Sequence, residues 1–84
     1  MEYKVLIKLI VPEIEESYEA FIPVNKTVGE VLILLNQLVN NFSGIYPIKK
    51  GMLLYNRYTG NVYGGNKLIR ETDIRNGTEL VLVS

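Results

Sequence analysis

The sequence predicts an α+β fold in which one main helix covers one face of a small mixed β-sheet. Two stretches of alternating apolar and polar residues open the chain, at residues 3–11 and 17–24, which is typical of paired strands. A single apolar stripe with helical spacing follows at residues 28–42. The chain has 84 residues, of which 48% are hydrophobic, so we expect one domain over residues 1–84.

The two opening strands are expected to pair as an antiparallel hairpin. The first strand, residues 3–11, carries lysines on one face and ends at Pro12. An acidic connection leads into the second strand, residues 17–24, which Pro23 closes. The pattern does not decide whether Phe21 or its neighbours face the core, because a one-residue shift in register exchanges the two faces.

The main helix has a strong start signal. Thr27 and Glu30 match the capping box, in which the threonine hydroxyl and the glutamate carboxylate accept from each other's backbone N–H groups. We expect the helix to run from Val28 to about residue 41 or 42 and to end at Ser43-Gly44. The residues expected to face the sheet are Val28, Val31, Leu32, Leu35, Leu38, Val39 and Phe42.

The second half of the chain supplies the remaining strands. Glu71 or Thr72 is expected to open a helical turn. The expected elements are a third strand (52–58), a very short fourth (62–63), the helical turn (71–74), an Asn76-Gly77 turn and a closing strand (78–83). This is the element order of the β-grasp fold. It has a four- to five-stranded mixed sheet, with the first and last strands parallel at its centre.

Composition argues against several classes of function. Nine basic and nine acidic residues cancel, which argues against a nucleic-acid partner. The chain has no cysteine and no histidine, so thiol nucleophiles, histidine bases and cysteine-held iron–sulfur clusters are unavailable. The acidic residues Glu13, Glu15 and Glu16 lack the spacing of a calcium loop, and the Gly64-Gly65 pair is expected to supply positive φ in a loop. We therefore expect no enzyme, no bound metal and no cofactor.

Two features of the sequence bear on where the protein is found in the cell. No apolar stretch approaches the roughly 20 residues that span a bilayer. The first four residues lead directly into a strand pattern, without the features of a signal peptide. We therefore expect a cytoplasmic protein that does not insert into membranes.

Several spaced residues resemble those of ubiquitin-like proteins, over nearly the whole chain. The helix entry Thr27-Val28-x-x-Val31 and the run Leu68-x5-Ile74 with Thr78-x-Leu80-x-Leu82 are similar to ubiquitin's helix start and closing strand. The stretch from Tyr55-Asn56-Arg57 through Val62-Tyr63-x-Gly65 to Asp73-Ile74-x-Asn76-Gly77 resembles the YukD-like family more closely. Those are small bacterial ubiquitin-fold proteins associated with type VII (WXG-type) secretion loci. The resemblance implies an accessory or adaptor role in such a machine.

The helix-free face of the sheet is the first candidate surface. Alternate residues of the first and last strands are expected to face away from the helix as one apolar patch, which either Leu54 or Leu53 extends. The candidate protein-binding residues are Leu6, Ile10, Leu54, Val81 and Val83. Cross-strand packing under lysine stems is the alternative explanation. By resemblance, this is also the face through which receptors bind ubiquitin.

A second candidate surface combines the helix and the loop after the third strand. Ile33 is expected to point away from the buried stripe, although an isolated exposed isoleucine is ordinary. Tyr55, Arg57, Tyr58 and Tyr63 flank that loop. Tyrosine with arginine is the common composition of binding hot spots, although tyrosine is equally common in strands.

These observations predict a ubiquitin-like protein-interaction module that is a monomer or a weak homodimer. We expect it not to be conjugated, because Ser84 follows the closing strand where such proteins carry Gly-Gly. A modifier or sulfur carrier remains an alternative if the natural chain continues to Gly-Gly. A second alternative is strand addition through residues 17–24, which Pro23 and Glu19 disfavour. A third is a self-associating structural subunit that uses the same sheet patch.

Overall fold

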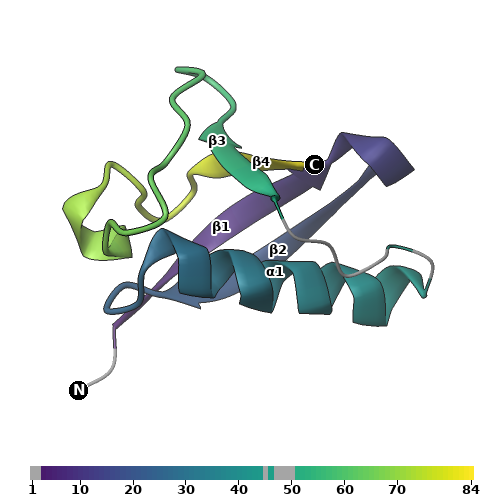
Figure 1. The fold of residues 1–84 in the computed structure, drawn as a ribbon, viewed down its shortest axis with the longest axis horizontal. Helices are drawn as coiled ribbons and strands as arrows, with labels where there is room; N and C mark the ends of the chain where they lie inside the picture. Colours follow the sequence, from purple (N-terminus) through teal and green to yellow (C-terminus); the bar gives the residue numbers. More distant parts are fainter. Residues whose placement is uncertain (1–2, 45, 47–50) are drawn as a thin grey trace.

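One helix and a four-stranded sheet form two layers (Figure 1). The computed structural model describes residues 3–44, 46 and 51–84. The sheet has the order β2-β1-β4-β3, and helix α1, Val28–Ser43, runs along one of its faces. The strands are β1 (Lys4–Val11), β2 (Glu16–Pro23), β3 (Leu53–Asn56) and β4 (Glu79–Val83). The central strands β1 and β4 are parallel and the outer pairs are antiparallel, which confirms the predicted β-grasp order.

The predicted capping box begins α1. The Thr27 hydroxyl accepts from the Glu30 N–H at 3.2 Å, and the Glu30 carboxylate accepts from the Thr27 N–H at 3.1 Å. At the other end, Gly44 takes a left-handed conformation (φ 73°) and its N–H donates to the Asn40 carbonyl. The helix is therefore bounded close to where the sequence predicted. In the part of the chain that the structure describes, no helix has the length and apolarity to cross a bilayer.

The core lies between α1 and the sheet. It contains Ile7, Leu9, Val11, Ala20, Ile22, Val28, Val31, Leu35, Val39, Tyr46, Met52, Leu54, Ile69, Ile74, Leu80 and Leu82. Ala20 and Ile22 face the core, so Phe21 faces outward, which settles the question that the pattern of β2 left open. Phe42, predicted in the buried stripe, is instead 73% exposed and stacks on Tyr18 with ring centroids 5.8 Å apart. Tyr46, fully buried, occupies the end of the core in its place.

The third strand is shorter than predicted, because Asn56 turns the chain. Its Oδ1 accepts from the N–H groups of Tyr58 (2.8 Å) and Thr59 (3.1 Å), which stops the strand before residue 57. The predicted short strand at residues 62–63 amounts to one bridge between Tyr55 and Val62. The described part of the chain therefore contains four strands. The predicted loop at residues 45–51 lies mostly outside the described residues.

The C-terminal helical turn lies earlier than predicted. It is a 3-10 turn at Ile69–Glu71, whereas the sequence placed it at residues 71–74. Glu71 and Thr72 close this turn and do not open it. The Glu71 carboxylate accepts from the Leu68 N–H at 2.9 Å, and the Thr72 hydroxyl donates to the Ile69 carbonyl at 2.6 Å.

The Gly64-Gly65 pair serves the start of the helix. The expectation of positive φ there is wrong, since the described glycines with positive φ are Gly44, Gly51, Gly60 and Gly77. Gly65 instead accepts a hydrogen bond from the Gly29 N–H at 3.0 Å, and a Cβ on Gly29 would lie only 3.3 Å from that carbonyl oxygen. Close approach of two backbones explains glycine at Gly29.

Candidate protein-binding surface

The helix-free face of the sheet carries a row of alternating charges. The strand register pairs Lys8 of β1 with Glu19 of β2 and with Glu79 of β4. Arg57 lies beside Glu79 just beyond β3, and its N–H donates to the Glu79 carbonyl at 3.0 Å. Across the four strands the order is therefore Glu19, Lys8, Glu79 and Arg57, with the sign changing at each step. We call these four residues the charge row.

Glu79 is the most constrained member of the charge row. Its carboxylate accepts from the Arg57 guanidinium at 2.7 Å and from the Tyr58 hydroxyl at 2.6 Å. The hydrogen bond from Tyr58, followed by Arg57, lowers the pKa of Glu79. The same contacts to Glu79 raise the pKa of Arg57 and of Tyr58. Arg57 also lies over the Tyr58 ring, 5.6 Å from its centroid. These contacts hold the end of the charge row in one arrangement.

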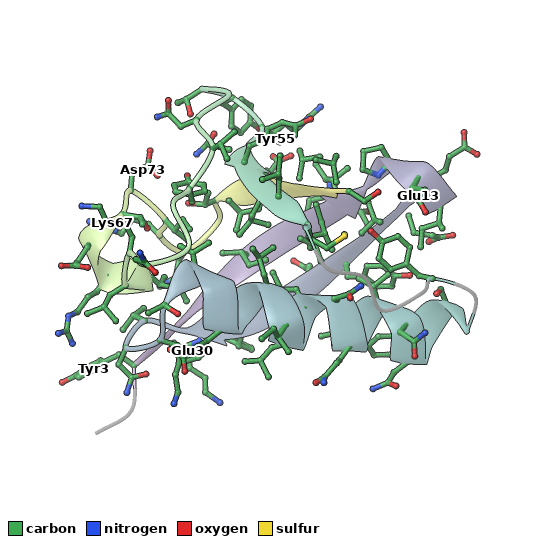
Figure 2. The ribbon with its side chains drawn as sticks, viewed as in Figure 1. Tyr3, Glu13, Glu30, Tyr55, Lys67 and Asp73 are labelled. Atoms are coloured by element: carbon green, nitrogen blue, oxygen red, sulfur yellow. The ribbon has the colours of Figure 1, made fainter. Side chains whose placement is uncertain are left out.

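Apolar side chains gather on one side of the charge row. The register places Val81 between Ile10 and Tyr55, and it places Leu53 beside Val83. Figure 2 shows Tyr55 on the part of β3 that lies away from α1. Val62 joins this group through its bridge to Tyr55. We call the group the Val83 cluster; it consists of Ile10, Leu53, Tyr55, Val62, Val81 and Val83.

A smaller apolar pair lies on the opposite side of the charge row. Leu6 of β1 is the register partner of Phe21 of β2, and Phe21 is 66% exposed. The Asn76-Gly77 turn packs next to Leu6. The Leu6 N–H donates to Asn76 Oδ1, and the Leu6 carbonyl accepts from the Gly77 N–H, both at 2.8 Å. The single apolar patch predicted from the sequence is therefore two groups, separated by charges.

The predicted residues of the first surface fall into three environments. Ile10 and Val83 are half-buried on the helix-free face, as Leu6 is. Val81 is on that face but only 4% exposed, since Ile10 and Tyr55 flank it on both sides. Leu54 is 0% exposed and belongs to the core, so its prediction as a surface residue is wrong. Leu53, the neighbour that the sequence offered as the alternative, is 49% exposed on the helix-free face.

The predicted residues of the second surface do not form one site. Ile33 is 60% exposed on α1, as its helical position predicted, but α1 covers the opposite face of the sheet. Tyr55, Arg57 and Tyr58 lie with the Val83 cluster and the charge row. Tyr63 is half-buried against the core and holds the loop together.

Hydrogen bonds explain the position of Tyr63. Its hydroxyl donates to Asp73 at 2.6 Å and accepts from the Asn56 amide at 3.1 Å. Burial, followed by the hydrogen bond to Asp73, raises the pKa of Tyr63 to about 12. A tyrosine held in this way contributes to structure more than to an open surface.

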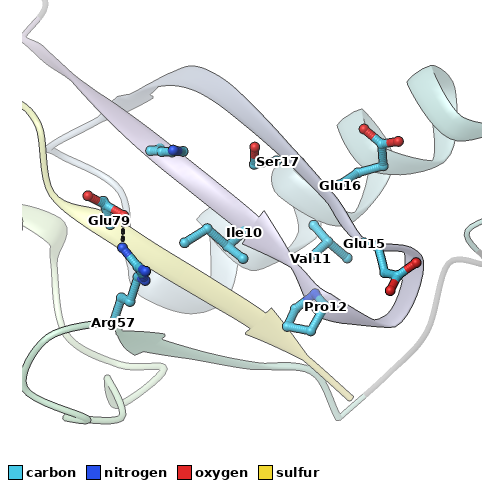
Figure 3. Close-up of a pocket in the computed structure, with 9 residues that line it drawn as sticks. Ile10, Val11, Pro12, Glu15, Glu16, Ser17, Arg57 and Glu79 are labelled. Carbon is cyan, nitrogen blue, oxygen red and sulfur yellow. Dashed lines mark hydrogen bonds and ion pairs between the residues drawn. The ribbon is translucent and has the colours of Figure 1, made fainter.

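A shallow hollow adjoins both the charge row and the Val83 cluster (Figure 3). It has a volume of about 310 Å³, and Ile10 lies between its charged sides. Its lining residues are Lys8, Ile10, Val11, Pro12, Glu15, Glu16, Ser17, Arg57 and Glu79. The ion pair of Arg57 with Glu79 lies on one side of Ile10, and Glu15 and Glu16 supply negative charge on the other side. The hollow suits a mixed apolar and charged group better than a small apolar ligand.

Three apolar residues of this surface were not among the predicted binding residues. Phe21 was left open by the alternation of β2, Leu53 was an alternative to Leu54, and Val62 was assigned only to a short strand. Their register with β1, β4 and Tyr55 places all three on the helix-free face. Among the described residues, no group of three or more carboxylates offers a metal site.

Comparisons with known proteins identify the fold. Neither a protein-family model nor a curated protein matches this sequence. Ubiquitin from Caldiarchaeum subterraneum is similar in structure, with a TM-score of 0.70 and 18% identity over 98% of this chain and 94% of that one. A chain of the toluene 4-monooxygenase HD complex with 4-bromobenzoate has a TM-score of 0.81 and 10% identity over 96% and 98%.

A third similar structure is part of a much longer chain. It comes from the MycP5-free ESX-5 inner membrane complex, with a TM-score of 0.68 and 15% identity over 95% of this chain and 20% of that one. At these identities the comparisons show the fold alone. The protein has a ubiquitin-like β-grasp fold, in agreement with the order of its elements.

Proposed function

We propose that this chain is a ubiquitin-like protein-interaction module that binds a larger protein through the Val83 cluster. One observation carries the proposal: apolar side chains gather on the face of the sheet that α1 leaves uncovered, with Leu53 and Val62 exposed. An apolar centre with charges at its border is the usual composition of a protein interface. Tyr55 and Arg57 belong to the residue types that dominate binding energy at such surfaces.

We propose a binding role without catalysis. The chain has neither histidine nor cysteine, which removes the commonest general base and the thiol nucleophile. Glu79, one of the carboxylates that line the hollow, has a lowered pKa and stays ionised at neutral pH. A carboxyl group that donates protons near neutral pH needs a raised pKa instead.

A role as a cytoplasmic accessory of a bacterial type VII secretion system is the more specific form of this proposal. Two observations favour it. Residues 55–77 resemble the YukD-like family, and one similar structure is part of an ESX-5 inner membrane complex. Both observations are likenesses of sequence pattern or fold, and a fold does not by itself define a function. The identity of the binding partner therefore decides whether the protein serves a secretion system.

Capture from a lysate of the native host, with matched variants, tests the proposal. Leu53→Glu places a charge in the Val83 cluster, and Ile33→Glu places the same charge on α1 at a comparably exposed position. We expect a protein that wild type and Ile33→Glu retain and that Leu53→Glu loses, with both variants folded by circular dichroism. Retention by Leu53→Glu, or loss only with Ile33→Glu, would reject the Val83 cluster as the binding surface. A captured protein outside the secretion apparatus would reject the accessory role alone.

A further inference from the structure

The order of signs in the charge row has a property that the apolar groups do not share. From β2 to β3 the row is negative, positive, negative, positive: Glu19, Lys8, Glu79 and Arg57. The same row taken in reverse is positive, negative, positive, negative. The charge row is therefore complementary to its own reversed copy.

We propose that two copies of this chain pair through their helix-free faces, about a two-fold axis parallel to the strands between β1 and β4. Such an axis places β2 of one copy over β3 of the other, and β1 over β4. Glu19 then faces Arg57 of the second copy, and Lys8 faces Glu79 of the second copy. All four contacts across the interface join opposite charges.

The other simple two-fold arrangement is excluded by the same charges. An axis perpendicular to the strands would place each strand over its own copy, and where it crosses the charge row Glu19 would face Glu19 and Lys8 would face Lys8. Like charges brought together at an interface cost several kcal/mol. The charge row therefore selects the orientation of the pair as well as permitting it.

The apolar groups agree with this orientation. Rotation about an axis parallel to the strands does not change the position of a residue along the strand direction. The Val83 cluster of one copy therefore meets the Val83 cluster of the other. Ile10 then lies over Val81 of the second copy, since the two are register partners on β1 and β4. Apolar surface meets apolar surface on one side of the charge row, while the charges meet their opposites in the middle.

The size of the face predicts that the pair is weak. Side chains on one face of a strand recur every second residue, about 6.6 Å apart, so four strands at about 4.8 Å spacing with about four such levels cover about 500 Å². Stable complexes bury roughly 800 Å² on each partner, and charges brought out of water offset part of what their pairing contributes. The inference does not rest on the proposed partner, because it concerns the purified chain alone. It does imply that self-pairing and partner binding compete for the Val83 cluster.

Sedimentation equilibrium on the purified protein tests the pairing. At low salt, about 0.05 M, we expect a concentration-dependent dimer. Glu19→Arg alone and Arg57→Glu alone each create like-charge contacts at both ends of the interface, so each should weaken the dimer roughly tenfold or more. An equimolar mixture of the two variants joins arginine to glutamate at both ends, so the mixed dimer should form again. Ile33→Arg, on α1, is the control and should dimerise as wild type does.

Several results would overturn the inference. A wild-type chain that stays monomeric up to millimolar concentration contradicts it, and so does a dimer that is indifferent to Glu19→Arg. Failure of the mixed variants to associate, with both folded, contradicts the orientation. Arg57→Glu removes the contact to Glu79, so its fold is checked by circular dichroism. If that variant does not fold, the salt dependence decides: a wild-type dimer of equal strength at about 0.5 M salt rejects pairing through the charge row.

Discussion

Phe21 of β2 lies directly opposite Leu6 of β1, and both side chains lie on the helix-free face of the sheet. The charge row separates this pair from the Val83 cluster, although the sequence grouped Leu6 with Val81 and Val83. The face therefore offers two apolar groups with a band of charge between them. A partner that covers the whole face has to match this alternation along the strands, which makes the surface more selective than one continuous apolar patch.

Leu54 and its neighbour Leu53 should differ sharply in their effect on stability. Leu54 is buried opposite Leu82, whereas Leu53 is half exposed. We expect Leu54→Ala to lower the free energy of unfolding by about 2–5 kcal/mol. Leu53→Ala should lower it by at most about 1 kcal/mol. Urea unfolding followed by circular dichroism measures both, and equal losses would contradict the assignment of the two faces of β3.

Asn76 should stabilise the sheet through a single hydrogen bond. Its Oδ1 accepts from the Leu6 N–H at 2.8 Å, at the point where β1 has no strand partner on that side. We expect Asn76→Ala to cost about 1 kcal/mol of unfolding free energy, because the Leu6 N–H loses its acceptor. Asn66→Ala, in an exposed loop, is the matched control and should cost less than about 0.5 kcal/mol. An equal loss of unfolding free energy in both variants would contradict a stabilising role for the Asn76 hydrogen bond.

Glu79 should contribute to the loss of stability in acid. Its pKa is lowered in the folded protein from an ordinary value of 4.5, first by Tyr58 and then by Arg57. A carboxyl group with a lowered folded pKa stabilises the protein above its unfolded value, and that stabilisation disappears as the pH falls through the folded value. We expect Glu79→Gln to show a smaller fall in melting temperature than wild type as the pH drops below about 4.5. Part of the fall should remain, because the Thr27 N–H also lowers the pKa of Glu30. An unchanged pH profile in Glu79→Gln would contradict this account.

Tyr63 should contribute to the loss of stability in alkali. Its pKa rises from 10.0 to about 12 on folding, chiefly through burial. The neutral hydroxyl therefore stabilises the fold fully below pH 10.0, and that stabilisation is lost as the pH rises through about 12. Absorbance of tyrosinate, compared between wild type and Tyr63→Phe, isolates this residue. A difference spectrum that titrates near pH 10 would show that Tyr63 is not held as the structure indicates.

The fold was predictable because its signals are local. The capping box of Thr27 and Glu30 marks the start of α1, Gly44 marks its end, and period-2 alternation identifies β1. Phe42 was misplaced for a physical reason: helical spacing continues the apolar stripe to the end of α1, but the core ends near Val39 and Tyr46. Spacing along a helix does not show where the opposing layer stops.

The surface was less predictable because it depends on register. Residues 52–55 are all apolar, so alternation does not select a face, and the pairing of Leu54 with Leu82 does. The charge row depends on the offset between β1 and β4, which are far apart in sequence. Docking of the Asn76-Gly77 turn on Leu6 fixes that offset. Val81 was correctly placed on the helix-free face, but its burial by both neighbouring strands appears only once the pairs are known.

Nuclear magnetic resonance can locate the partner's contact surface on this chain residue by residue. Amide resonances of the isotope-labelled chain are followed while the partner captured from the host is added. We predict that the largest changes fall on Leu53, Val62 and Val83, and that Ile33 on α1 is unaffected. Changes centred on α1 around Ile33, with the Val83 cluster unperturbed, would contradict the claim that the helix-free face is the binding surface.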